Sequence, residues 1–248
     1  HYAGVSCDMD SIIKIAKQHK LYLIEDAAQA ILSTYKGKPL GSIGDLATLS
    51  FHQTKNIHCG EGGALLINNP KFIRRAKIIR DKGTNKDLFN QNMVKKYTWV
   101  DYGSSYGLDE INAAFLYSQF KQAKKITKKR INIFNKYHKQ LKSLEIKKLI
   151  KRPSIPKYAK HNGHIYYLIV KNNQRNKLIK HLRQKKINSV FHYIPLHSSK
   201  FGKIKTKTQM IMKNTNYISN NLTRLPFYVK LKDNDIKRIV KSITNFFV

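Results

Sequence analysis

The pattern of apolar and polar residues alternates between the period of helices and that of strands along the whole chain. Helical spacing of apolar side chains predicts helices at 12–19, behind the cap Asp10-Ser11, at 70–79, 108–141, 176–184, 210–222 and 233–247. Short apolar runs predict buried strands at 21–24, 48–51, 64–67, 164–170 and 188–194. Strands that alternate with helices indicate an α/β fold with an open parallel sheet.

A basic segment broken by two prolines divides this pattern. Residues 147–160 contain Pro153 and Pro156 and carry no clear helical or strand period. We therefore expect a larger domain at 1–146, which ends in the long helix, and a smaller α/β domain at 147–248.

Composition narrows the class of protein. A hydrophobic content of 41% is typical of a soluble globular chain. Two distant cysteines, Cys7 and Cys59, exclude a disulfide framework and a zinc knuckle, and they suit a reducing compartment such as the cytoplasm. No apolar run approaches the ~20 residues that span a bilayer, so we expect no membrane segment. We also expect no metal site.

The charge is large and unevenly distributed. The net charge is +34, with 39 lysines and 9 arginines, and residues 1–70 are neutral, so the remaining chain carries all of it. A nucleic-acid-binding protein is one explanation of such a charge. The basic residues are mostly lysines at helical spacing, without clustered arginines or interleaved aromatic residues, which favours an ordinary solvated surface.

Candidate chemistry lies where the first strands end. Asp26 and Gln29 follow one strand, and Ser50 and Lys55 flank the end of the next. In an open α/β sheet, ligands bind beyond the carboxyl ends of the strands, so these side chains should converge. A carboxylate, an amide, a hydroxyl and a lysine suit a cofactor with a basic ring nitrogen, a phosphate and an aldehyde. From spacing alone, Asp26 could equally cap a helix, and Lys55 could be an ordinary surface lysine.

Several longer stretches resemble one known family. They are EDAAQA at 25–30, LSFHQTKN at 49–56, GEGGALLIN at 60–68, IIRDKGTN at 78–85, YGSSYGLDEINAAF at 102–115 and FHYIPLH at 191–197. The chain is similar over nearly its whole length to the DegT/DnrJ/EryC1 sugar aminotransferases. The resemblance implies fold type I of the pyridoxal-phosphate enzymes, with pyridoxal 5'-phosphate as cofactor.

Within that family, TYKGKPLGSIGD, FHQTKN, DKGTN, KYTW and GSSY are similar to the transaminases that form dTDP-4-amino-4,6-dideoxygalactose for enterobacterial common antigen. This similarity implies amino transfer from L-glutamate to the 4-keto carbon of dTDP-4-keto-6-deoxy-D-glucose. It also implies a homodimer, because relatives build each site from two subunits.

The family's cofactor residues carry over to four positions. Lys55 matches the lysine that forms a Schiff base with the cofactor, and Asp26 matches the aspartate that faces the pyridine nitrogen. Gln29 matches a glutamine near the ring hydroxyl, and Ser50 matches a phosphate ligand. Because a related dehydratase would carry histidine in place of Lys55, the lysine favours transamination.

Other matches are looser. Ser105 stands where many relatives have an asparagine that reaches the partner subunit's cofactor phosphate. His192, Tyr193 and His197 lie in a segment that approaches the substrate in relatives, although a packed strand would also explain the two histidines. We expect His164 to be structural.

The family begins well upstream of the HYAG at residues 1–4. We therefore expect this chain to lack part of the large domain and of the cofactor site, and to expose the apolar run 21–24 at an uncovered edge. Alone, it should aggregate and bind the cofactor weakly. An inactive gene remnant is accordingly the main alternative to an active transaminase.

Overall fold

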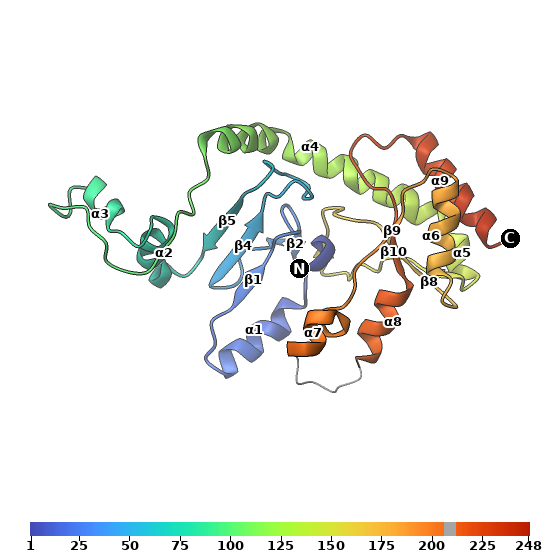
Figure 1. The fold of residues 1–248 in the computed structure, drawn as a ribbon, viewed down its shortest axis with the longest axis horizontal. Helices are drawn as coiled ribbons and strands as arrows, with labels where there is room; N and C mark the ends of the chain where they lie inside the picture. Colours follow the sequence, from blue (N-terminus) through green and yellow to red (C-terminus); the bar gives the residue numbers. More distant parts are fainter. Residues whose placement is uncertain (206–211) are drawn as a thin grey trace. The chain divides into compact units, whose positions relative to one another are not determined.

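The computed structural model describes residues 1–205 and 212–248 (Figure 1). Contacts between residues divide the chain into two compact units. Unit 1 comprises His1–Lys125 and Pro156–His164, and unit 2 comprises Ile126–Ile155 and Ile165–Val248. The predicted domains at 1–146 and 147–248 remain a prediction.

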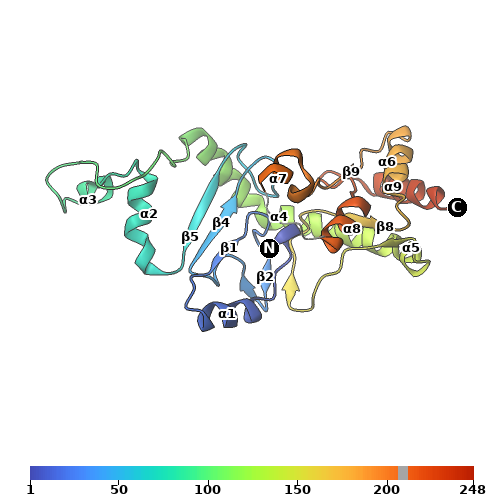
Figure 2. The same cartoon turned by 60° about the horizontal axis from the view of Figure 1, so that its bottom comes forward.

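The main sheet of unit 1 has three strands, β1 (Ile24–Asp26), β4 (Leu46–Ser50) and β5 (Gly63–Ile67). Figures 1 and 2 both show β4 between the other two. β1 runs parallel to β4, as predicted, but β5 is antiparallel to it. The expectation of a wholly parallel sheet is therefore wrong. Residues 51–62 contain no crossover helix, and without one the chain can only fold back alongside the strand it has left.

Unit 1 also contains several short helices, part of a long helix and a second small sheet. Its helices are η1 (Tyr2–Gly4), α1 (Met9–Gln18), η2 (Pro70–Phe72), α2 (Ile73–Arg80) and α3 (Lys86–Asn90), followed by the first part of α4 (Glu110–Gln140). A second sheet has the order β3-β2-β7, formed by β3 (Lys38–Pro39), β2 (Thr34–Tyr35) and β7 (Ala159–Lys160). The strand β7 lies in the connector between the two predicted domains. Residues far along the sequence therefore complete the second sheet of unit 1.

Helix α1 begins earlier than the sequence predicted. The predicted cap, Asp10-Ser11, lies inside the helix, and Asp8 occupies the N-cap position. The Ser11 hydroxyl donates to Asp8 Oδ2 at 2.7 Å, so the polar residues of the first turn bond to each other. Met9 then packs in a small core with Ala27, Ala30, Tyr35 and Leu40.

The apolar run before β1 is not buried. Leu21, Tyr22 and Ile24 are 61%, 55% and 61% exposed, because β1 is an edge strand among the described residues. The expectation of a buried strand at 21–24 is wrong, whereas the expected exposure of this run at a sheet edge is confirmed.

Unit 2 is built on an antiparallel sheet with the order β6-β8-β10-β9. Its strands are β6 (Ile150–Lys151), β8 (Tyr167–Val170), β10 (Leu222–Arg224) and β9 (Val190–Phe191). Its helices are the end of α4, α5 (Lys142–Ile146), α6 (Arg175–Gln184), η3 (Leu196–Ser198), α7 (Lys200–Lys205), α8 (Lys213–Asn221) and α9 (Asp233–Phe246). The long helix α4 thus forms close to its predicted range, and so do α6 and α9.

Two predicted strands form only in part. The strand expected at 164–170 is confined to β8, because His164 belongs to unit 1. The strand expected at 188–194 is confined to β9, which pairs with β10 over two residues. The helix expected at 210–222 forms as α8, and its predicted start, 210–211, lies outside the described residues.

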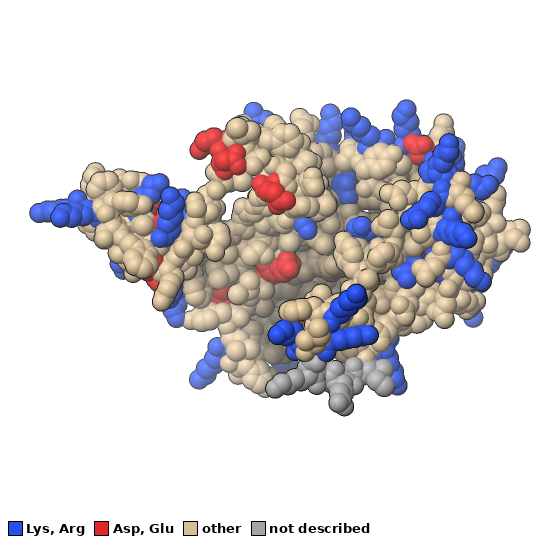
Figure 3. All heavy atoms as spheres, in the orientation of Figure 1, with Lys and Arg blue, Asp and Glu red and all other residues tan. Residues whose placement is uncertain are grey.

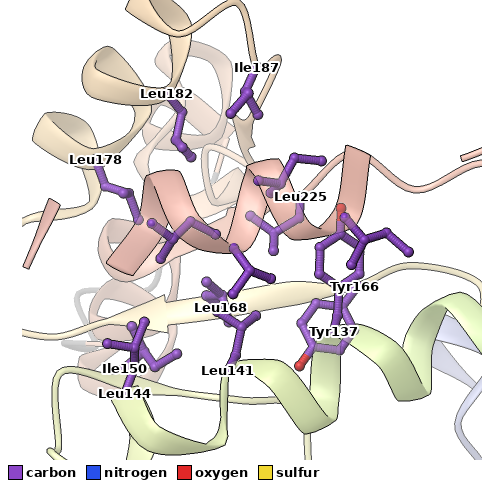
Figure 4. Close-up of a cluster of buried hydrophobic side chains, with 14 of the residues drawn as sticks. Tyr137, Leu141, Leu144, Ile150, Tyr166, Leu168, Leu178, Leu182, Ile187 and Leu225 are labelled. Atoms are coloured by element: carbon purple, nitrogen blue, oxygen red, sulfur yellow. The ribbon is translucent and has the colours of Figure 1, made fainter. Parts of the chain in front are cut away.

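Apolar side chains from the helices α4, α5, α6 and α9 and the strands β6 and β8 make the core of unit 2. Figure 4 shows Leu141, Leu168 and Leu182 pointing toward a common centre, with Tyr137 and Tyr166 beside them. The rings of Tyr137 and Tyr166 stack with centroids 5.1 Å apart. Burial of this cluster is the main source of stability for unit 2.

The surface of unit 2 is strongly basic. Figure 3 shows lysine and arginine side chains over much of its visible face. Its three acidic residues are all engaged: Glu145 pairs with Arg152, Asp233 pairs with Lys136, and Asp235 accepts from the Lys232 N–H. Among the described residues, no helix combines the length and apolar character that crossing a bilayer requires.

We predict that Leu182→Ala lowers the free energy of unfolding by about 3 kcal/mol, because the substitution leaves a cavity around a fully buried side chain. Denaturant titration followed by circular dichroism measures the loss. Ile146→Ala, at a position that is 69% exposed in the same unit, is the control and should change stability by no more than about 0.5 kcal/mol. Equal effects of the two substitutions would contradict the core assignment.

Candidate active site

Three strand ends of unit 1 meet at one edge of the main sheet. β1 and β4 are parallel, with Asp26 opposite Thr48, so both strands finish at the same edge. Ser50, the last residue of β4, is opposite Gly63, the first residue of β5. Lys55 lies in the loop between these two strands. The convergence expected from the sequence therefore holds for the strand ends that carry Asp26 and Ser50 and for the loop that carries Lys55.

Asp26 is exposed at this edge, and its carboxylate is only partly occupied. Its Oδ1 accepts the Ala28 N–H at 3.0 Å, within a turn rather than at the start of a helix. Asp26 therefore stabilises a turn and does not cap a helix. Its other carboxylate oxygen, Oδ2, has no hydrogen-bond partner in the described chain. One carboxylate oxygen is left for a ligand.

Gln29 stands three residues further along the same turn. Its Oε1 accepts the Ala3 N–H at 2.6 Å, and its own carbonyl accepts from Asn162 at 2.8 Å. With the oxygen of the amide in use, its NH₂ group is the part that can donate to a ligand.

Lys55 is half-buried and has no bound counterion. Within residues 1–205 and 212–248, its Nζ takes part in no hydrogen bond or ion pair, whereas its backbone N–H donates to the His52 carbonyl at 2.9 Å. A lysine in a partly buried turn with no carboxylate beside it keeps its amine available for covalent chemistry.

Hydrogen bonds and an ion pair between residues close in sequence stabilise the loop that carries Lys55. His52 Nδ1 accepts the Thr54 N–H at 3.2 Å, so its proton is on Nε2, which lies 3.3 Å from the Glu61 carboxylate. Ser50 Oγ accepts the His52 N–H at a long 3.4 Å. The Ser50 hydroxyl therefore keeps its proton for another acceptor, such as a phosphate oxygen.

Sequence reasoning missed Glu25 as a member of this site. Its carboxylate is buried, 3% exposed, and accepts the backbone N–H groups of Gly41, Ile43 and Gly44 at 2.7–2.8 Å. His1 Nε2 lies 2.9 Å from the same carboxylate. The available signal was an acidic residue directly after an apolar run, where a buried carboxylate needs several donors.

Ser105 is not brought to the sheet edge by any contact in the described chain. It is exposed and forms an isolated bridge with Asp81, beside α2. Hydrogen bonds from the Ser104 and Tyr106 N–H groups to the carbonyls of Ile79 and Arg80 hold this segment. No hydrogen bond or ion pair in the described chain joins Ser105 to Asp26 or Lys55, and its assignment remains a prediction about a second subunit.

The three substrate candidates belong to unit 2. His192 directly follows β9 and is buried; burial, together with the Arg224 guanidinium, lowers its pKa to about 4. Tyr193 is 62% exposed, and its ring lies 5.8 Å from the Arg224 guanidinium carbon. His197 Nε2 lies 2.8 Å from Asn216 Oδ1. A packed strand end describes His192 well, whereas Tyr193 is open to a ligand.

Metal ligands do not gather anywhere in residues 1–205 or 212–248: these ranges hold no group of three or more histidine, cysteine or acidic side chains placed to bind an ion. The donor set at the sheet edge is instead one carboxylate oxygen, one amide NH₂, one hydroxyl and one amine. These groups match, in turn, a ring nitrogen, a ring hydroxyl, a phosphate and an aldehyde, so the residues present fit pyridoxal phosphate.

Comparison with known proteins identifies the chain's relatives. The model of the DegT/DnrJ/EryC1/StrS aminotransferase family matches residues 1–244. The chain belongs to this aminotransferase family. The expected family is thereby confirmed, while the narrower subgroup stays a proposal.

Two known proteins match in sequence over 98% of this chain. One is an uncharacterised protein of Methanocaldococcus jannaschii, 35% identical, and the other is the spore coat polysaccharide biosynthesis protein SpsC of Bacillus subtilis, 30% identical. The chain spans 64% of the length of each.

Solved structures of this family share the fold. S. venezuelae DesV, determined in complex with a ketimine intermediate, superposes with a TM-score of 0.88 at 25% identity, covering 99% of this chain and 63% of DesV. Helicobacter pylori PseC, an aminotransferase of pseudoaminic acid biosynthesis, gives 0.86 at 24% identity, covering 99% and 65%. The predicted α/β architecture, fold type I of the pyridoxal-phosphate enzymes, is confirmed.

We predict that His192 stays neutral down to about pH 4, because burial and, secondarily, Arg224 disfavour its cation. Its C2–H resonance in NMR, assigned with His192→Gln, measures the midpoint. Between the unfolded pKa of about 6.5 and the folded value, the unfolded chain binds more protons, so this residue costs stability as pH falls through that window. Arg224→Gln should raise the midpoint only part of the way. A midpoint near 6.5 in the unmodified protein would contradict the burial of His192.

Proposed function

We propose that the chain is a pyridoxal-phosphate-dependent sugar-nucleotide aminotransferase. The observation that carries the proposal is the amine of Lys55, free of any counterion in the described chain, in the loop that leaves β4 beside the strand end of Asp26. Membership of an aminotransferase family supports the same conclusion. Because the chain spans 64% of its relatives' length, the proposal concerns the activity of the whole protein.

Each of four residues at the sheet edge would bind a different group of the cofactor. Lys55 would bind its aldehyde, Asp26 its pyridine nitrogen, Gln29 its ring hydroxyl, and Ser50 its phosphate. Ser105 would reach the cofactor phosphate of a second subunit, which makes a homodimer part of the proposal. When bound, pyridoxal phosphate supplies a carbonyl that exchanges amino groups and a ring that accepts electrons from the adjacent carbon.

The chain's own groups would perform the proton transfers. Nζ of Lys55 would serve as the base and acid that moves the proton during the exchange of the amino group. The negative charge of Asp26 keeps the ring nitrogen protonated, and this stabilises the negative charge that develops in the transition state. Both roles need only residues at the sheet edge of unit 1.

We propose L-glutamate as amino donor and dTDP-4-keto-6-deoxy-D-glucose as acceptor, giving dTDP-4-amino-4,6-dideoxy-D-galactose in the cytoplasm. The motifs GSIGD at 41–45 and KYTW at 96–99 support this choice over other sugars. Tyr193, exposed beside Arg224, is a candidate contact for the sugar nucleotide, and His192 and His197 are weaker ones. Lysines on the basic surface would attract the diphosphate.

We predict that Lys55→Ala abolishes covalent capture of the cofactor. After incubation with pyridoxal phosphate and reduction with borohydride, mass spectrometry of the peptides should find the cofactor on Lys55 in the wild type and nowhere in the variant. Lys38→Ala, on the exposed strand β3, is the control and should retain capture on Lys55. Turnover or capture that survives Lys55→Ala would remove Lys55 from its role and refute the proposal.

We predict that Asp26→Asn slows both half-reactions by about two orders of magnitude, because asparagine keeps the bond to the Ala28 N–H but removes the charge. Cofactor affinity should change much less, since the transition state depends on the ring charge more than the ground state does. Stopped-flow absorbance with glutamate, and then with keto sugar, measures each rate. The matched control is Asp10→Asn, which removes another exposed carboxylate of unit 1. A near-normal rate in Asp26→Asn would leave the carboxylate with only its turn-stabilising bond.

A further inference from the structure

Three polar side chains are buried together in unit 1, and one of them directly follows Lys55 in the chain. They are Asn56, Asn162 and His164, which are 6%, 0% and 8% exposed. We call them the asparagine network. Asn56 directly follows Lys55, whereas the other two arrive from the segment Pro156–His164, about a hundred residues later. Buried polar groups of this kind are stable only where each has specific partners.

Asn162 holds the segment that contains Gln29. Its amide NH₂ donates to the Gln29 carbonyl at 2.8 Å and to the Ile31 carbonyl at 2.9 Å. Two carbonyl acceptors require two N–H donors, so an aspartate of the same shape could not replace this residue without repulsion. Its Oδ1 packs against Gly4, where a Cβ would lie 2.0 Å away and where φ is +74°.

Asn56 links the Lys55 loop to the same segment. Its Nδ2 donates to the Asn162 carbonyl at 3.2 Å, and its Oδ1 lies 3.1 Å from His164 Nδ1. Because Asn56 Oδ1 can only accept, the imidazole carries its proton on Nδ1. Since the side chain of Lys55 makes no hydrogen bond of its own in the described chain, its position depends on the fixed residue beside it.

We propose that Asn162 and Asn56 are positioning residues, which fix the Lys55 loop relative to the turn that carries Gln29 so that the amine meets the cofactor aldehyde at reactive distance. The inference rests on the proposed function. A single polar segment contacts both pieces of chain, and displacement of a reacting group by about 1 Å can cost about 100-fold in rate. The network therefore acts on the attachment of the cofactor to Lys55, and it touches neither cofactor nor substrate itself.

Asn162→Asp in the full protein tests this directly. Asn221→Asp is a closely matched control: Asn221 is also buried, donates its Nδ2 to one carbonyl at 2.8 Å, and lies in unit 2. We expect Asn162→Asp to lower the rate of borohydride-trapped attachment at Lys55 by about tenfold or more, with noncovalent cofactor binding by equilibrium dialysis nearly unchanged. The pH midpoint of the bound cofactor's visible absorbance should shift as well, because the environment of the Lys55 nitrogen changes. The control should show neither effect.

Asn56→Asp provides a second, milder variant. Aspartate keeps the acceptor for His164 but turns one donor contact, to the Asn162 carbonyl, into a repulsion between two oxygens, whereas Asn162→Asp does so at two carbonyls. We therefore expect a smaller reduction in attachment and a smaller shift of the absorbance midpoint. A cooperative thermal transition by circular dichroism establishes that each variant is folded. If Asn162→Asp does not fold, Asn56→Asp decides, and if neither folds the network is purely structural and the proposal is rejected.

Different experimental outcomes refute the proposed function and the positioning role. Wild-type protein that traps no cofactor on Lys55 refutes the proposed function, and the positioning role with it. Wild-type protein that traps cofactor normally, alongside folded Asn162→Asp and Asn56→Asp variants that trap it at the same rate and with the same absorbance midpoint, overturns the positioning role and leaves the proposed function intact.

Discussion

A buried carboxylate holds the sheet edge of unit 1 together. Glu25 accepts three backbone N–H groups from Gly41, Ile43 and Gly44, and leaving such a group without donors inside a protein costs several kcal/mol. The turn at 41–44 must therefore close on β1 before the chain enters β4. Asp26 is the next residue after Glu25, so its carboxylate is presented at the edge by a backbone that cannot shift independently. Candidate chemistry at this edge depends on that one buried charge.

The sequence predicts those parts of the site that follow from strand ends. Asp26 and Ser50 come directly after apolar runs, and Lys55 follows within a short loop, so local pattern and sheet geometry suffice to bring them together. Contacts between distant segments leave no periodic signal. For that reason neither the donors to Glu25 nor the approach of Asn162 to Gln29 could be predicted. The antiparallel direction of β5 was missed because the strand period is the same in both directions.

The predicted starts of two elements, the helix α1 and the strand at 164–170, are wrong, and polar side-chain contacts lie at both places. The strand expected at 164–170 begins only at Tyr167, and His164 belongs to unit 1, where its side chain bonds to Asn56. The expected cap of α1 lay two residues too late, since Asp8 and Ser11 bond to each other across the first turn. In both places a side-chain hydrogen bond lies at the mispredicted boundary, and apolar spacing carries no trace of such a bond. Apolar spacing alone located the long helix α4 almost correctly, because its second half packs in the core of unit 2.

The path of the chain has a consequence for how the protein is made. Unit 1 is interrupted: the chain leaves it after Lys125, builds part of unit 2, and returns at Pro156 to add β7 beside β2 and Asn162 beside Gln29. During synthesis, which adds about 5–20 residues per second, the first hundred residues leave the ribosome long before their partners exist. The Lys55 loop therefore stays incompletely anchored until residue 164 has emerged, by which time the whole of α4 has already been made. Such late, long-range closure favours slow folding, because the entropy of closing the loop must be lost before these contacts form.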